Sequence, residues 1–252
     1  EALLTGESTP GARPLGMGEA FSAVAEGPEA LFWNPAGLAQ LKKPQGSYTR
    51  SELLDFFHHD YAAYAHPVRA LSGTVAISYT RLTQQYLPVI TNANQTIGRF
   101  SPHSESISLG YARSFEVAPV DGGERDYFGE AWAVPGATRP LKFKNEPWTG
   151  SVMVGIAAKY IYESYYNQSA DTLAMDGGAI FRPEALQQLS ISGSFRNLGG
   201  RQQFDREYEV LPAEFDFGLA YDKRWWGHRL LPSFELALPY FGSPFAKVGA
   251  EY

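Results

Sequence analysis

Apolar and polar residues alternate along most of the chain after residue 43, a pattern typical of β-strands with two unlike faces. The clearest stretch runs from Gly150 to Tyr162, where apolar residues at even positions oppose small or polar residues at odd ones, with Ile161 as an exception. The alternation also predicts strands over residues 73–80, 106–115, 189–197, 214–221, 233–238 and 246–252. In total the sequence predicts about nine or ten strands.

Residues 1–43 do not follow this alternation and are predicted to form an irregular tail and a small helical region. From Pro14 the spacing becomes helical, since Leu15, Phe21 and Val24 fall near one helical face before Gly27 and Pro28 interrupt it. A second short helix is predicted over residues 29–32, with Trp33 beside it and Pro35 ending it. Asn34 is expected to bond its side chain to nearby backbone and to shape the turn.

Alternation alone fits both a soluble β protein and a transmembrane β-barrel. Aromatic pairs near predicted strand ends favour the barrel, because such rings prefer the membrane–water boundary. These pairs are Tyr165-Tyr166, Trp225-Trp226 and Tyr240-Phe241. The polar strand face also carries charges of both signs, which suits a crowded lumen: Lys159, Asp176, Arg196, Glu214, Asp216, Glu235, Lys247 and Glu251.

Two connections are predicted to be long, Gln84 to Pro102 and Ala118 to Trp148, and the others short. Long loops on one side and short turns on the other are typical of outer-membrane barrels. We therefore predict a helical hatch or plug over residues 1–43 and a transmembrane antiparallel β-barrel over residues 44–252.

Composition narrows the choice of function. The chain has 252 residues, no cysteine and a formal net charge of -6, which argues against cysteine chemistry and nucleic-acid binding. No apolar run approaches the roughly 20 residues of a membrane helix. No Gly-x-Ser-x-Gly motif is present, so neither an enzyme activity nor a cofactor is expected.

The N-terminal region resembles the start of the PorV/PorQ proteins, members of the FadL-like superfamily of outer-membrane barrels. The segments that carry this resemblance are Gly11-Ala12-Arg13, Leu15-Gly16-Met17-Gly18, Ala20-Phe21 and Ala30-Leu31-Phe32-Trp33-Asn34-Pro35-Ala36-Gly37-Leu38. Weaker similarities follow at residues 155–163, 176–179, 196–199, 211–213, 218–221 and 247–252, so the resemblance covers most of the chain.

The resemblance implies a barrel of about fourteen strands with an N-terminal hatch in its lumen. It also implies either a role in type IX protein secretion, as for PorV-type members, or FadL-type transport of hydrophobic compounds. With too few predicted strands, the chain either forms a smaller barrel or lacks C-terminal strands, and we favour the second interpretation.

Three sets of candidate residues follow. The hatch motif comprises Asn34, Pro35, Ala36 and Gly37 with Gly16 and Gly18, and it either gates a ligand pocket or fixes the plug in the lumen. We expect the two earlier glycines to pack closely against the barrel wall rather than to cradle a phosphate. The inward charges either tune passage of a solute or pair with one another and with the plug. Apolar residues in the long connections either dock a partner or fold back on the barrel: Leu87, Val89, Ile90, Ile97, Phe100, Phe128, Trp132 and Trp148.

These residues support two functional hypotheses besides a soluble β-rich binding module. In the first, the protein is an accessory subunit of secretion whose loops dock a larger translocon or a secreted cargo protein. In the second, it imports a hydrophobic small molecule. The small and charged inward faces favour the first, because an oily solute needs a mostly apolar pocket. The adjacent His58 and His59 would point to opposite strand faces, so no metal site is expected there.

Overall fold

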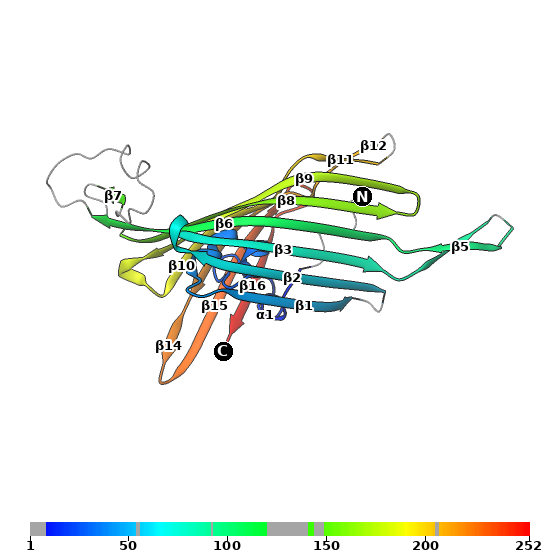
Figure 1. The fold of residues 1–252 in the computed structure, drawn as a ribbon. Coiled ribbons are helices and arrows are strands. Elements are labelled where there is room, and N and C mark those ends of the chain that lie inside the picture. The colour runs from blue at the N-terminus through cyan, green and yellow to red at the C-terminus, as the bar shows by residue number, and fades with distance from the viewer. Residues whose placement is uncertain (1–8, 54–55, 92, 120–140, 144–148, 205–206) are drawn as a thin grey trace.

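The computed structural model describes residues 9–53, 56–91, 93–119, 141–143, 149–204 and 207–252. Its main feature is a 12-stranded sheet (Figure 1). The long strands follow one another in this order: β1 (Gln45–Leu53), β2 (Phe57–Val68), β3 (Gly73–Gln84), β6 (His103–Pro119), β8 (Gly150–Tyr165), β9 (Gln168–Pro183), β10 (Leu189–Gly199), β13 (Glu214–Tyr221), β15 (His228–Pro239) and β16 (Phe245–Glu251). Each pairs with the next in antiparallel fashion, so the predicted β-rich class is confirmed.

Several shorter elements accompany this sheet. β14 (Lys223–Trp225) pairs with the start of β15, and β7 (Leu141–Phe143) lies parallel to the end of β6. Two separate hairpins are formed by β4 (Leu87–Ile90) with β5 (Thr96–Phe100), and by β11 (Arg201–Phe204) with β12 (Glu207–Val210). Single turns of 3₁₀ helix occur at η2 (Arg69–Leu71) and η3 (Glu184–Leu186). The four hairpin strands were not predicted from the sequence, because each is only four or five residues long.

The predicted barrel does not close among the described residues. β1 pairs with β2 and β16 with β15, but β1 and β16 are not paired with each other. The sheet is instead curved and open, with two edge strands (Figure 1). The nine antiparallel pairings between them make β1 and β16 run in opposite directions.

The two long connections leave opposite ends of the sheet, so the expectation of long loops on one side was wrong. Residues 85–102 carry the β4–β5 hairpin at one end, which we call the hairpin end, together with turn 166–167. β6 ends and β8 begins at the other end, which we call the η3 end, where turns 69–72 and 184–188 also lie (Figure 1). The reason is that only one strand, β6, separates the two connections.

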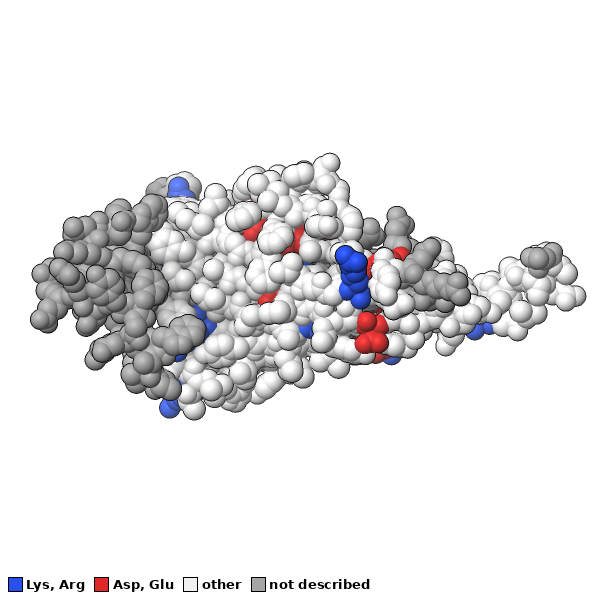
Figure 2. Space-filling view, turned by 90° about the horizontal axis from the view of Figure 1, so that it is seen from above, with Lys and Arg blue, Asp and Glu red and all other residues white. Residues whose placement is uncertain are grey.

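Burial along the strands is the reverse of that in a water-soluble sheet. The outer, convex face exposes apolar side chains such as Leu109 (60 %), Leu173 (68 %) and Phe217 (54 %). The inner face buries charged ones such as Asp176 (0 %) and Glu235 (1 %). In the view of Figure 2, Lys, Arg, Asp and Glu form only small patches over the middle of the molecule. No described helix is both long and apolar enough to cross a membrane.

The N-terminal segment, residues 9–41, lies against the inner face of the sheet. It contains α1 (Ala12–Gly16), α2 (Ala30–Trp33) and the 3₁₀ helix η1 (Pro35–Gln40). The predicted helix from Pro14 onward ends at Gly16, and turns follow. Leu15 is consequently exposed, whereas Phe21 and Val24 are buried. The second predicted helix is confirmed in position, while the 3₁₀ helix that starts at Pro35 was not predicted.

Candidate functional site

The inner face of the sheet, together with the N-terminal segment that covers it, is the candidate functional site. Large apolar side chains of the segment fill the space above the strands, and the core cluster is nearly inaccessible to solvent: Met17, Phe21, Leu31, Trp33 and Leu38. The rings of Phe21 and Trp33 meet edge to face at 5.8 Å, and the Trp33 indole N–H donates to the Pro10 carbonyl at 3.1 Å. A buried indole therefore keeps a hydrogen-bond partner.

Asn34 fixes the middle of the segment by three hydrogen bonds. Its side-chain oxygen accepts from the Ala36 backbone N–H at 3.1 Å, as the sequence predicted for a turn-forming asparagine. Its side-chain nitrogen donates to the Ser22 carbonyl at 3.1 Å and to the Ala179 carbonyl of β9 at 3.5 Å. Asn34 is fully buried, so these bonds satisfy polar groups that are shielded from water.

Small residues on the strands let the segment approach the sheet closely. At Gly155 on β8, any Cβ would collide with the backbone of Pro35 and Ala36, and at Gly178 on β9 it would collide with the Asn34 side chain. Asn34, Pro35 and Ala36 of the hatch motif therefore rest directly on strand glycines, whereas Gly37 packs against Ala25 and Ala30 of the segment itself. Backbone that is approached so closely has room only for hydrogen at Cα.

The two earlier glycines of the predicted motif differ from each other. Gly18 has a positive φ of 56°, and a Cβ there would lie 2.6 Å from the Val248 carbonyl oxygen of β16, so close packing holds at this position. Gly16 is exposed, with nothing within 4 Å of a Cβ, so the predicted close packing was wrong there. The chain turns after α1, and this turn places the backbone of Met17 and Gly18, but not of Gly16, against β16.

The predicted inward charges are brought together in two adjoining groups. In the first, the Lys159 ammonium of β8 lies 2.6 Å from an Asp176 carboxylate oxygen of β9. The other Asp176 oxygen accepts from the Asn197 backbone N–H at 2.7 Å, and Lys159 donates to the Asn197 side chain at 2.9 Å. Lys159 and Asp176 are almost inaccessible to solvent, and their direct contact compensates both buried charges.

The second group spans β10, β13, β15 and β16. Arg196 pairs with Glu214 and, at 3.3 Å, with Asp216. Lys247 lies 3.2 Å from both Glu214 and Glu235 and 3.6 Å from Asp216. Glu235 also accepts from the Ser22 backbone N–H at 2.8 Å, which ties the network to the N-terminal segment. The inward charges therefore pair with one another and with the segment.

Aromatic rings of the segment cover the cations of both groups. The Phe32 ring lies 5.7 Å from the Lys159 ammonium and 5.6 Å from the Arg196 guanidinium carbon, which is also 5.4 Å from the Trp33 ring. Such cation–π contacts are more favourable where water is excluded. A small cavity of about 70 Å³ remains beside Phe32, Lys159 and Arg196. Sequence reasoning missed Phe32 and Asn197 as members of the site, because their partners come from distant strands.

The N-terminal segment also contacts both edges of the open sheet. Arg13 donates to Glu251 of β16 at 2.6 Å and pairs with Glu26. Burial lowers the pKa of Arg13, but its hydrogen bond to Glu251 and the charge of Glu26 outweigh this, so the pKa is raised. At the other edge, the segment approaches β1, because a Cβ at Gly27 would lie 3.7 Å from the side-chain oxygen of Gln45. Burial raises the pKa of Glu29, and the positive charge of Arg13 opposes the shift.

The predicted partner residues lie away from this site. Leu87, Val89, Ile90 and Phe100 belong to the β4–β5 hairpin, which projects beyond the sheet (Figure 1). Phe100 packs edge to face against Tyr165 at 5.6 Å and Tyr166 at 5.1 Å, which holds the base of the hairpin to the β8–β9 turn. Ile90 and Ile97 are exposed. Phe128, Trp132 and Trp148 lie outside the described residues.

The histidines do not assemble a site. His59 is buried on the inner face of β2, and the neighbouring His58 is only partly covered. Within the described part of the chain, no group of three or more His, Asp or Glu side chains is arranged to hold a metal ion.

With this geometry established, the chain was compared with known proteins. No known family model matches its sequence. No curated protein matches it either.

Proposed function

We propose that the chain forms most of a transmembrane β-barrel of the bacterial outer membrane, with its N-terminal segment as the plug. The observation that carries this proposal is the inversion of the two sheet faces described above. In water, charged residues are rarely buried and broad apolar faces are rarely exposed. In a bilayer the same arrangement is favourable, because lipid covers the apolar face and the charges pair inside.

The bilayer also requires the sheet to close, because unpaired edge backbone groups in hydrocarbon each cost several kcal/mol. β1 and β16 run in opposite directions, so their edges can pair directly or through an even number of added antiparallel strands. The N-terminal segment approaches both edge strands, at Gln45 of β1 and at Glu251 of β16, so it lies between the two edges that would meet on closure.

Within this architecture we propose the role of an accessory subunit in protein secretion, of the PorV type in type IX secretion. The plug fills the middle of the lumen with buried aromatic and aliphatic side chains, which suits a scaffold better than a pore. The projecting β4–β5 hairpin offers the exposed Ile90 and Ile97 to a translocon or a cargo protein. FadL-type import would need a mostly apolar passage, whereas the inner strand face mixes apolar residues such as Ile161 with buried charges such as Lys159 and Asp176.

The membrane part of the proposal is tested by a matched pair of substitutions. Leu109→Arg places a charge near the middle of β6 on the apolar face, where it costs about 2–4 kcal/mol in a bilayer. Leu186→Arg makes the same change in the exposed η3 turn. We expect Leu109→Arg to reduce the folded, detergent-extractable fraction in the outer membrane and Leu186→Arg to leave it unchanged. Recovery of the unmodified protein in the soluble fraction would overturn the proposal.

The docking role has its own test. The protein is purified from its native membrane in mild detergent, and co-purifying proteins are quantified for the wild type and for Ile97→Asp. A large partner in stoichiometric amount that is lost in Ile97→Asp supports the secretion role. Bound lipid-like molecules in the lumen with no such partner would instead support import of hydrophobic compounds.

A further inference from the structure

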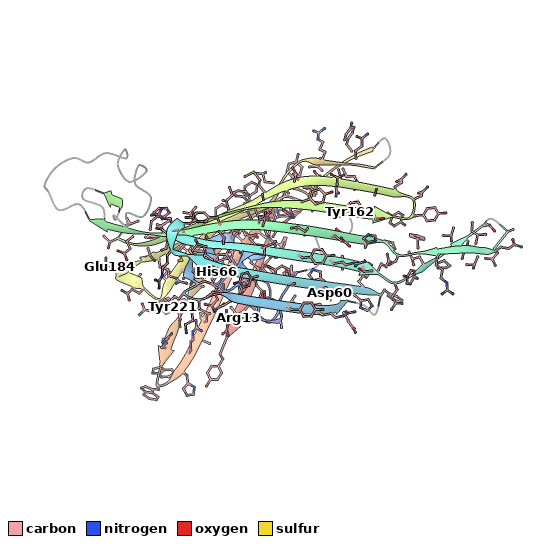
Figure 3. The ribbon with its side chains drawn as sticks, in the orientation of Figure 1. Arg13, Asp60, His66, Tyr162, Glu184 and Tyr221 are labelled. Atoms are coloured by element: carbon pink, nitrogen blue, oxygen red, sulfur yellow. The ribbon has the colours of Figure 1, made fainter. Side chains whose placement is uncertain are left out.

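A polar cavity of about 230 Å³ opens at the η3 end between the N-terminal segment and the sheet, away from the charge network described above. Four parts of the chain meet there: the segment, the β9–β10 turn, the residues after β13 and the start of β15. The Asp222 backbone N–H donates to the Gln188 carbonyl at 2.8 Å, which joins two of these parts. Figure 3 places Glu184 of the turn and Tyr221 of β13 toward this end of the molecule.

Three arginines line this cavity, and two of them are held by carboxylates. Arg13 pairs with Glu26 and Glu251. Arg229 donates to both oxygens of Asp222 at 3.1 Å. These pairs compensate the positive charge at two corners of the cavity.

Arg182 differs from the other two arginines in its partners. Its guanidinium donates to the Gln40 side-chain oxygen at 2.7 Å and to the Ser190 hydroxyl at 3.0 Å, both of which are neutral. These two neutral acceptors orient the guanidinium. The carboxylates of Glu26 and Asp222 also line the cavity and act on the charge of Arg182, but their direct pairs are with Arg13 and Arg229. Arg182 is partly buried, so solvent screens that charge less than at an open surface.

We propose that this cavity binds a small oxyanion, a phosphate or carboxylate group, with Arg182 as its main ligand. A guanidinium presents parallel N–H donors that match the oxygens of such groups. The carboxamides of Gln187 and Gln188 also line the cavity and supply further donors. Its volume is below that of a drug-sized pocket, so it suits a single charged group. The inference does not depend on whether the sheet spans a membrane.

The test is a calorimetric titration of the purified protein, in phosphate-free detergent buffer, with inorganic phosphate and in parallel with glycerol phosphate. We expect a dissociation constant below about 1 mM for at least one of them. Similar affinities point to a free anion, whereas markedly tighter glycerol phosphate points to a lipid headgroup. Absence of binding for both would overturn the inference.

Variants assign the binding to Arg182. Loss of a charged hydrogen-bond donor in Arg182→Gln should weaken binding by roughly tenfold to a hundredfold. Arg182→Lys keeps the positive charge but lacks the parallel N–H donors of a guanidinium. Its affinity for the anion should therefore lie between those of Arg182→Gln and the wild type. Arg81→Gln is the control, because Arg81 is exposed on β3 and pairs with Glu105 at 3.4 Å. Unchanged binding in a folded Arg182→Gln protein, verified by its thermal midpoint, would contradict the inference.

Discussion

The inner and outer faces of the same strands carry opposite kinds of side chain: the inner face buries charged residues, and the outer face exposes apolar ones. On β13, Glu214 and Asp216 point inward into ion pairs, while their neighbours Phe215 and Phe217 are exposed. Side chains on the inner face contact several strands and the N-terminal segment. Those on the outer face contact neighbouring strands, as Phe195 does Phe215, but among the described residues no segment covers them. Whether a side chain here is buried or exposed therefore depends on the face of the sheet that it occupies more than on its residue type.

The largest effect should come from removing a buried cation. Lys247→Met leaves Glu235, which is nearly inaccessible, without its ammonium partner at 3.2 Å. Breaking a buried pair by removing one partner lowers the free energy of unfolding by about 3–5 kcal/mol. On the outer side, Arg81→Met removes an exposed pair with Glu105 and should cost only about 0–1 kcal/mol. Urea unfolding in detergent micelles measures both, and equal losses would contradict the contrast between the faces.

A smaller effect should come from adding a methyl group on each face. Gly155→Ala pushes a Cβ into the backbone of Pro35 and Ala36, and such overpacking costs about 1–3 kcal/mol. Gly193→Ala on β10 meets only Phe217 carbons at 3.8 Å and 3.9 Å, an ordinary contact, and should change stability by less than about 0.5 kcal/mol. Thermal melts of the two variants decide the matter. If Gly193→Ala proved the more damaging, the segment would not rest on β8 as described.

The inner face was also the part that sequence reasoning resolved least. The alternation of apolar and polar residues located the strands and identified which charges share a face. This works because successive side chains of a β-strand point to opposite faces. Which charges meet depends on strand order and register, so Lys247 with Glu235 could not be paired from spacing. The contrast between Gly16 and Gly18 depends on the turn after α1, for which the sequence carries no periodic signal. Sheet closure likewise depends on contacts between edge strands that are distant in sequence.

The smallest effect concerns how the stability contributed by Glu29 of the N-terminal segment depends on pH. Because burial raises the pKa of Glu29 above its ordinary value of 4.5, its contribution to stability is complete below that value and is lost as pH rises through the folded pKa. At neutral pH the charged Glu29 is therefore slightly costly in the folded state. Glu29→Gln should raise the thermal midpoint modestly near pH 7, and the gain should shrink toward zero below about pH 4. Midpoints measured across this range test the sign, and a gain that grew on acidification would show that the Arg13 charge, rather than burial, dominates at Glu29.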